Sequence, residues 1–227
     1  ELGGKSAMLV LDAESVPLGA MFCSFAVTSH AGQGCAVTSR LVVPRAQLDE
    51  AVQAVVGTMQ GLKVGDPNEP DTYVGPLINR RQLDKVQAIV DRAVADGATV
   101  ATGGKAVATE QGFFFEPTLL VGADEHSEIA QDEIFGPVLV ILPHDGDDDA
   151  VRIANDSKFG LSAGVMSADD ERSLAVARRL RAGTLSVNGG NYYAPDAPFG
   201  GYKQSGIGRE SGVAGMEEFL EIKTLAM

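Results

Sequence analysis

Apolar and polar positions change their spacing several times along the chain, and each change marks the border of a predicted element. Short uninterrupted apolar runs predict buried strands. Longer segments in which apolar residues recur every three or four positions predict helices with one buried face. The predicted strands cover residues 7–11, 37–43, 99–102, 113–121, 138–142, 162–165 and 183–187. The predicted helices cover residues 16–29, 45–60, 80–95, 147–155 and 169–181.

Strands and helices alternate in this pattern, which is typical of an α/β sheet with helices on both faces. We therefore predict a three-layer α/β/α sandwich. Pro117 lies inside the predicted strand 113–121, so we expect that strand at an edge of the sheet. The last apolar run, residues 219–225, predicts a further edge strand.

Length, charge and cysteine content narrow the class of protein. A chain of 227 residues can bury a sizeable core in one large or two small domains. The formal net charge of −13 argues against nucleic acid as a partner. No apolar run is long enough for a membrane span, and no signal peptide is visible. Two cysteines fit a reducing compartment without a disulfide framework, so we expect a cytoplasmic location.

The candidate nucleophile is Cys35, which ends the segment GQGC after an apolar predicted helix. A cysteine acts as a nucleophile only as the thiolate, which needs a polar and accessible setting such as a turn. The preceding glycines permit a tight backbone and leave room for a substrate beside the sulfur. On spacing alone a buried structural cysteine remains the stronger alternative. Cys23 lies within the apolar helix, where we expect it to be buried.

The histidines suggest neither a catalytic partner nor a metal site. His30 lies five residues before Cys35, too close in the chain to indicate the long-range pairing of cysteine proteases. His126 and His144 lie in acidic segments, where we expect them to be solvated. No cluster has metal-ligand spacing, so we expect no metal site.

Several segments occur in an order that is typical of one enzyme family. They are ELGGKSAMLV, GQGCAVTSRLVV, EIFGPVL, NDSKFGLSAGV, SVNGG and PFGGYKQSGIGRE. In these segments the chain resembles the catalytic half of the aldehyde dehydrogenase superfamily, over essentially all of its length. The resemblance implies oxidation of an aldehyde to a carboxylic acid with NAD or NADP as cofactor.

The resemblance also implies roles for two reacting groups. Cys35 matches the nucleophile, which forms a thiohemiacetal and, after hydride transfer to the nicotinamide, a thioester. Glu1 matches the base that activates water for hydrolysis of the thioester. Its presence favours hydrolysis over transfer of the acyl group to coenzyme A. From the residues alone, Glu1 could equally be a solvated terminal carboxylate.

Further residues match the family's binding positions. Glu133 and Phe135 match residues that hold the nicotinamide ribose and pack beside the nicotinamide, and Gln82 matches a position that can touch the ribose. Tyr193 and Phe199 match aromatic positions of the substrate tunnel and suggest an apolar or aromatic aldehyde. From the residues alone, other interpretations remain open. Glu133 could be an acidic loop residue, Phe135 a core residue and Gln82 a surface residue of its helix, and the two aromatic residues could simply pack within a loop.

The chain also departs from the family. Complete members carry, before the segment that matches ELGGK, a domain that binds NAD and supplies an oxyanion-hole asparagine. Here Gly206 and Gly208 are followed by Ser211 where a dinucleotide-binding GxGxxG turn needs its third glycine. Loss of one oxyanion donor costs about 100- to 1000-fold in rate, so we expect little dehydrogenase activity from this chain alone.

We expect residues 1–217 to form the catalytic domain and residues 218–227 to be a remnant of an oligomerisation strand. We expect the face that would meet the NAD-binding domain to be exposed and apolar, which predicts that the chain forms a homo-oligomer. Two alternatives to the dehydrogenase remain, a weak cysteine-dependent esterase and a non-catalytic assembly module.

Overall fold

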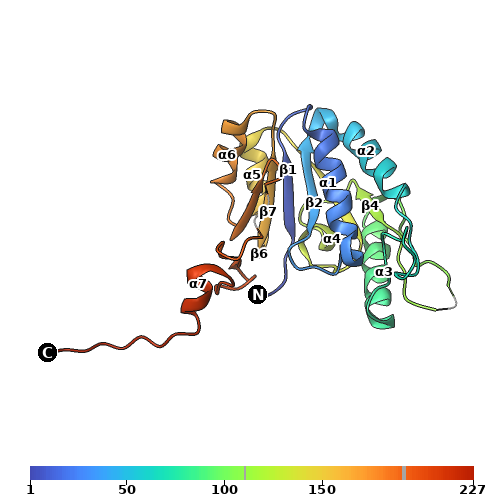
Figure 1. Ribbon diagram of the computed structural model, residues 1–227. Coiled ribbons are helices and arrows are strands. Elements are labelled where there is room, and N and C mark those ends of the chain that lie inside the picture. Colours follow the sequence, from blue (N-terminus) through green and yellow to red (C-terminus); the bar gives the residue numbers. More distant parts are fainter. Residues whose placement is uncertain (110, 191–192) are drawn as a thin grey trace.

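The central feature of the computed structural model is a seven-stranded sheet in the order β3-β4-β5-β2-β1-β7-β8 (Figure 1). The structure describes residues 1–109, 111–190 and 193–227. The strands are β1 (Ser6–Val10), β2 (Thr38–Pro44), β3 (Thr99–Thr102), β4 (Thr118–Val121), β5 (Val138–His144), β7 (Ser162–Met166) and β8 (Thr184–Val187). Neighbours pair in parallel, except β3 with β4. A separate antiparallel pair joins β6 (Phe159–Gly160) and β9 (Tyr202–Lys203).

Helices cover both faces of this sheet (Figure 1). Helices α1 (Val16–Thr28) and α2 (Leu48–Gln60) pack on one face, and α5 (Asp147–Asn155) and α6 (Asp170–Ala177) pack on the other. Helix α3 (Arg80–Ala95) and the short α4 (Glu128–Gln131) share a third apolar cluster with residues of β4 and β5. The last helix is α7 (Gly212–Glu217). The predicted three-layer α/β/α sandwich is confirmed.

The core explains why the strands appear as unbroken apolar runs. Successive side chains of a strand point to opposite faces of the sheet. In β1, Met8 and Val10 pack with α1 and α2, whereas Ala7 and Leu9 pack with α5 and α6. A parallel strand that is covered on both faces therefore needs apolar residues at every position.

No helix among the described residues combines the length and the apolar character needed to cross a membrane.

Most predicted borders agree with the structure, but the strand around Pro117 differs. Strand β4 begins at Thr118, directly after the proline. Proline has no N–H to donate to a sheet ladder, so regular pairing starts one residue later. Because β4 lies between β3 and β5, the prediction of an edge strand is wrong.

Three further predicted elements differ from the structure by more than two residues or are absent from it. The helix predicted from residue 45 starts as a 3₁₀ turn, Arg45–Gln47, before α2. Helix α6 begins after Asp169, whose carboxylate accepts two backbone N–H bonds, and ends at Ala177 instead of residue 181. Residues 219–225 form no strand, and this segment extends away from the body of the molecule (Figure 1). A lone strand has no partner for its backbone groups, which explains the difference.

Candidate functional site

A cavity of about 570 Å³ lies at the edge of the sheet where β1, β2 and β7 begin. These strands are parallel neighbours, with Ser6 of β1 opposite Thr38 of β2 and Ala7 opposite Ala163 of β7. The segments that precede the three strands therefore meet at one edge. The cavity lining includes Glu1, Cys35, Ser162, Tyr193, Phe199 and Glu210. Four of the seven candidate residues from the sequence thus face one space.

The turn that carries Cys35 is unusually tight. Helix α1 ends at Thr28 and is followed by a turn in which His30 and Ala31 have φ values of 49° and 54°. Gly32 also has a positive φ, and a Cβ there would overlap the carbonyl oxygen of Gly136. The GQGC turn therefore packs backbone to backbone on the EIFGP turn, which is possible only because glycine lacks a side chain.

The segment that precedes β1 contacts both of these turns. A Cβ on Gly4 would overlap the carbonyl oxygen of Cys35. The N–H of Gly4 donates a hydrogen bond of 3.0 Å to Oε1 of Glu133. The side chain of Ser205 donates to the carbonyl oxygen of Gly3 at 2.6 Å and anchors the segment from the other side. The motifs ELGGK, GQGC and EIFGP therefore form one unit, although the second lies more than 30 residues after the first and the third more than 90 residues after the second.

The Cys35 thiol is half-buried and free. Burial raises its pKa, and the carboxylates of Glu1 and Glu133 raise it further. The backbone N–H groups of Cys35 and Ala36 act in the opposite direction. The sulfur is therefore a thiol at neutral pH and needs a base to become a nucleophile. Cys23 is fully buried, as expected, and burial raises its pKa to about 12.

Glu1 lines the cavity and has a raised pKa, first through partial burial and then through the nearby carboxylate of Glu210. A carboxylate with a raised pKa is suited to accept a proton near neutral pH. Glu210 was not singled out in the sequence. Its backbone exchanges hydrogen bonds of 2.8 and 2.7 Å with Phe199, which fixes it at the cavity. Only the fold brings these two carboxylates together.

Two of the three candidate cofactor residues, Glu133 and Phe135, lie on one turn beside the cavity, and the third, Gln82, reaches this turn from α3. Glu133 is half-buried, and Phe135 has a φ of 60°. The side-chain Nε2 of Gln82 donates to the carbonyl oxygens of Ile134 and Phe135, at 3.0 and 2.8 Å. The structure thus brings Glu133 close to Cys35, while the Gln82 side chain binds the backbone of the turn that carries Glu133 and Phe135.

Aromatic side chains form one wall of the cavity. The rings of Tyr193 and Phe199 stack with centroids 5.6 Å apart. Phe22 of α1 contributes a further apolar surface. His30 also lines the cavity, because the left-handed turn after α1 directs the chain back along it. Chain spacing could not reveal this placement of His30.

Two buried cations lie next to this unit, and neither was singled out in the sequence. Lys5 is 2% exposed, and its Nζ has no hydrogen-bond partner among the described residues. Burial, assisted by Arg40, lowers the Lys5 pKa to about 7. Arg40 is equally buried and donates to the carbonyl oxygens of Lys5, Ile153 and Ala154, at 2.9, 3.0 and 3.0 Å. It thus caps the carboxyl end of α5.

The prediction that His144 is solvated is wrong. His144 is 3% exposed because β5 continues to this residue. Its Nε2 lies 2.9 Å from the carbonyl oxygen of Val10, and its Nδ1 accepts a 3.1 Å hydrogen bond from the N–H of Gly146. The ring therefore joins two segments of the backbone as a neutral imidazole that carries its proton on Nε2.

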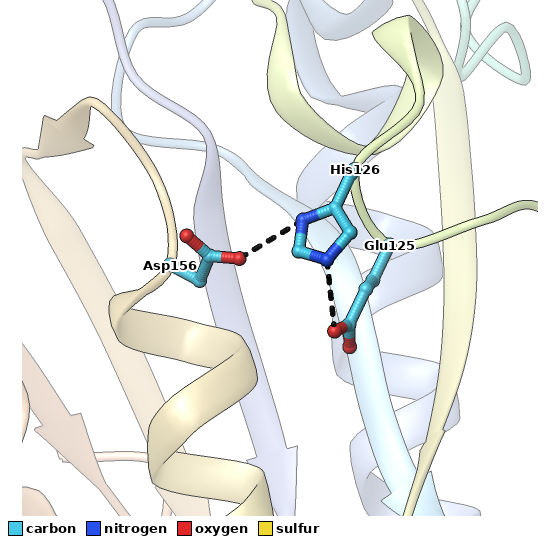
Figure 2. A group of neighbouring side chains, drawn as sticks. All are labelled: Glu125, His126 and Asp156. Carbon is cyan, nitrogen blue, oxygen red and sulfur yellow. Dashed lines mark ion pairs between the residues drawn. The ribbon is translucent and has the colours of Figure 1, made fainter.

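A separate group of ionisable side chains consists of Glu125, His126 and Asp156 (Figure 2). Nδ1 of His126 lies 3.1 Å from Asp156, and Nε2 lies 3.4 Å from Glu125. Arg152 binds the same Glu125 carboxylate at 2.6 Å. Asp156 is 30 residues from His126 in the chain, so sequence spacing could not show this group. The side chains are largely exposed and form a surface ion-pair network, which is typically worth about 1 kcal/mol or less per pair.

Comparison with known proteins assigns the chain and its fold to one family of enzymes. The family model described as "Aldehyde dehydrogenase family" matches residues 1–225. Proteins of Staphylococcus haemolyticus and Staphylococcus epidermidis, whose names assign them provisionally to the aldehyde dehydrogenases, are 42% and 41% identical to the chain. Both matches cover 100% of this chain and 48% of the relative.

Solved structures agree with this assignment. A cysteine-to-alanine mutant of aldehyde dehydrogenase C from Pseudomonas syringae, crystallised with NAD+ and octanal, is 42% identical, with a TM-score of 0.90. That match covers 97% of this chain and 46% of the other. An aldehyde dehydrogenase of Mycobacterium tuberculosis in complex with NAD+ is 40% identical, with a TM-score of 0.89 over 96% of this chain and 45% of the other.

The chain belongs to the aldehyde dehydrogenase family. It spans about half the length of the curated relatives that it matches.

Proposed function

We propose that the cavity is the thiol centre of an NAD(P)-dependent aldehyde dehydrogenase that oxidises an aldehyde to a carboxylic acid. The observation that carries this proposal is the meeting of three segments at one cavity. Gly4 contacts the Cys35 backbone and binds the Glu133 carboxylate, while Glu1 lines the same space as Cys35. The residues proposed as nucleophile and cofactor-binding carboxylate are thus joined through Gly4, and the proposed base lines the same cavity as the nucleophile.

The proposed reaction starts with proton transfer from the Cys35 thiol to Glu1, directly or through water. The sulfur attacks the aldehyde carbon, and the carbonyl oxygen becomes the alkoxide of a thiohemiacetal. NAD(P)+, when bound, supplies the acceptor for the hydride, and a thioester on Cys35 remains. Glu1 releases the proton of the thiol to solvent and, as a carboxylate again, takes a proton from water, whose oxygen attacks the thioester. The carboxylic acid leaves, and the Cys35 sulfur is released for the next cycle.

Glu133 and Phe135 fit the nicotinamide end of the cofactor. One oxygen of Glu133 accepts the N–H of Gly4, which fixes the carboxylate and leaves the second oxygen to accept hydrogen bonds from ribose hydroxyls. Phe135 offers a half-buried ring at the same turn. Gln82 supports this turn by donating to the carbonyl oxygens of Ile134 and Phe135.

The cavity favours an aldehyde with an apolar or aromatic body. Tyr193, Phe199 and Phe22 supply aromatic lining, and the lining is mostly apolar. The related enzyme from Pseudomonas syringae was crystallised with octanal, whose chain is apolar. We extend that chemistry to this chain as a part of the proposal.

The decisive experiment measures thiol reactivity in residues 1–227. Cys35 should react with iodoacetamide at pH 8 at least about tenfold faster than Cys23, because the buried Cys23 thiol has a pKa of about 12. Hydrolysis of a nitrophenyl ester needs no nicotinamide, so it should persist in Cys23→Ala and disappear in Cys35→Ala. Equal labelling of the two cysteines, or ester hydrolysis that survives Cys35→Ala, would refute the nucleophile.

The ester assay also serves the second candidate function, a cysteine-dependent esterase. Cys35 and Glu1 line a cavity that can admit an ester without any cofactor. NADH formation from an aldehyde, measured with and without a cofactor-binding domain of the family, separates the two functions, because only the dehydrogenase forms NADH once that domain is present. Residues 1–227 contain no glycine-rich dinucleotide turn of the GxGxxG type, so we expect them alone to form close to none.

We further propose that the chain forms homo-oligomers through residues 218–227. Phe219, Ile222 and Leu225 are 89%, 98% and 82% exposed, an arrangement that apolar side chains rarely keep in isolation. Light scattering should show a mass that rises with concentration. A constant monomer mass at high concentration would contradict this assignment.

A further inference from the structure

Ser162, the first residue of β7, makes a buried contact with the turn that carries the candidate nucleophile. Its hydroxyl lies 2.8 Å from the carbonyl oxygen of Ala36 and 2.9 Å from Oγ of Ser6. Ser6 and Ser162 are 3% and 4% exposed. A hydroxyl has only one proton to donate. When Ser162 donates to Ala36, the Ser6 hydroxyl can donate to Ser162, which gives a short chain from β1 to the turn.

This contact completes the support of the Cys35 turn. The carbonyl oxygen of Cys35 rests against Gly4, before β1, and the next carbonyl, that of Ala36, is held by Ser162. The backbone N–H groups of Cys35 and Ala36 interact with the sulfur and favour its charged form. Their direction depends on the orientation of the peptide units in this turn. The Ala36 carbonyl belongs to the next peptide unit, Ala36–Val37, which shares the Ala36 Cα with the unit that carries the Ala36 N–H. A group that fixes the Ala36–Val37 unit therefore restrains its neighbour and acts on the sulfur without touching it.

We propose that Ser162 is a positioning residue for Cys35: the Ser162 hydroxyl holds the Ala36 carbonyl and thereby restrains the neighbouring peptide unit, which joins Cys35 to Ala36. The inference rests on the proposed role of Cys35 as the nucleophile. Ser162 also lines the cavity, but its assigned action is on the backbone of the turn and not on the substrate. Removal of the hydroxyl leaves the Ala36 carbonyl without this donor and frees the turn to rotate.

The expected effect is a less stable thiolate. One net hydrogen bond corresponds to about a two- to tenfold change in an equilibrium constant. The ionisable groups around the sulfur are Glu1 and Glu133 and, across the cavity, Glu210 and His30. Ser162→Ala changes none of them. A change in the titration of Cys35 would therefore report the turn itself.

The test is the pH dependence of Cys35 alkylation by iodoacetamide between pH 6 and pH 10, followed by mass spectrometry of the labelled peptides. Ser162→Ala should move the midpoint upward by about 0.5 to 1 pH unit and slow labelling at pH 7.5 about three- to tenfold. The matched control is Ser186→Ala. Ser186 is also buried in the cavity wall, but it donates to Gly190, at 2.8 Å, and not to the turn. Its profile should coincide with the wild type.

Two internal checks keep the result interpretable. Ser6→Ala removes the other hydroxyl of the chain and should move the midpoint in the same direction by a smaller amount, so it carries the test if Ser162→Ala does not fold. Labelling of the buried Cys23 reports opening of the whole domain and should stay unchanged.

Each outcome bears on a separate claim. An upward shift in the Ser162 and Ser6 variants alone supports the positioning role. An unmoved midpoint in Ser162→Ala, an equal shift in Ser186→Ala, or faster Cys23 labelling in parallel with the shift overturns it. If Cys35 of the wild type labels no faster than Cys23, the nucleophile itself is refuted, whatever the serine variants do.

Discussion

Replacement of Lys5 by methionine should make the protein more stable at low pH and should flatten its pH dependence. Lys5 is buried next to the site, and its Nζ has no hydrogen-bond partner among the described residues. Burial lowers its pKa from 10.5 to about 7, with Arg40 and Lys85 acting in the same direction and Asp132 and Glu133 opposing them. Methionine has a similar volume and no charge, so it removes the free-energy cost of burying an ammonium group and retains the packing.

The sign of the effect follows from proton binding in the two states. Between pH 7 and pH 10.5 the unfolded chain holds the Lys5 proton while the folded chain has lost it. The free energy of unfolding of the wild type therefore rises with pH across this window. Below pH 7 both states are protonated, and the cost of the buried charge is fully present. With each pKa unit worth about 1.4 kcal/mol, that cost is about 5 kcal/mol at pH 6 and about 2 kcal/mol at pH 9.

The assay is urea unfolding of the wild type and of Lys5→Met at pH 6, 7, 8 and 9, followed by circular dichroism. The difference between the two proteins removes the contributions of other titrating groups, such as Cys23. The exposed Lys105 provides the matched control, and Lys105→Met should differ from the wild type by a small and constant amount. A Lys5→Met difference that is independent of pH, or that grows with pH, would refute the reasoning.

Two further predictions concern the backbone around the site. Gly4→Ala should abolish the rapid alkylation of Cys35, because the added Cβ overlaps the Cys35 carbonyl oxygen. The control is Gly57→Ala in α2, where a Cβ meets open space. This variant should keep the alkylation rate and stabilise the protein by about 0.5–1 kcal/mol. Equal alkylation rates in the two variants would contradict this. Arg40→Met should lower the stability by about 3 kcal/mol and the melting temperature by about 10 °C, because three buried carbonyl oxygens lose their donor. A melting temperature within 2 °C of the wild type would show that water replaces the guanidinium.

Hydropathy patterns predicted most of the fold because most elements bury a regular face. The bounds of α3 and α5 agree residue for residue with the predicted 80–95 and 147–155. The failures have local causes. Pro117 stops sheet pairing without placing β4 at an edge, and residues 219–225 have the composition of a strand without a partner for it.

The site itself could be predicted only where the residues matched a known family. Glu1, Cys35 and Glu133 precede different strands, and their meeting depends on the parallel register of β1, β2 and β5. No spacing in the chain encodes that register. The same reason explains why Glu210 and Ser162 were not singled out. Glu210 is of interest because it lies near Glu1, and Ser162 because it contacts Ser6 and Ala36. All these partners are distant in the sequence.

The raised pKa of the Cys35 thiol has a consequence for the resistance of the protein to oxidation. Peroxides attack the thiolate far faster than the thiol, and repeated oxidation ends in products that cannot be reduced. Partial burial and the carboxylates of Glu1 and Glu133 keep the sulfur protonated at rest. We therefore expect Cys35 to be oxidised slowly in the absence of a substrate. In the proposed mechanism, it becomes fully reactive only when a proton acceptor and a substrate are both present.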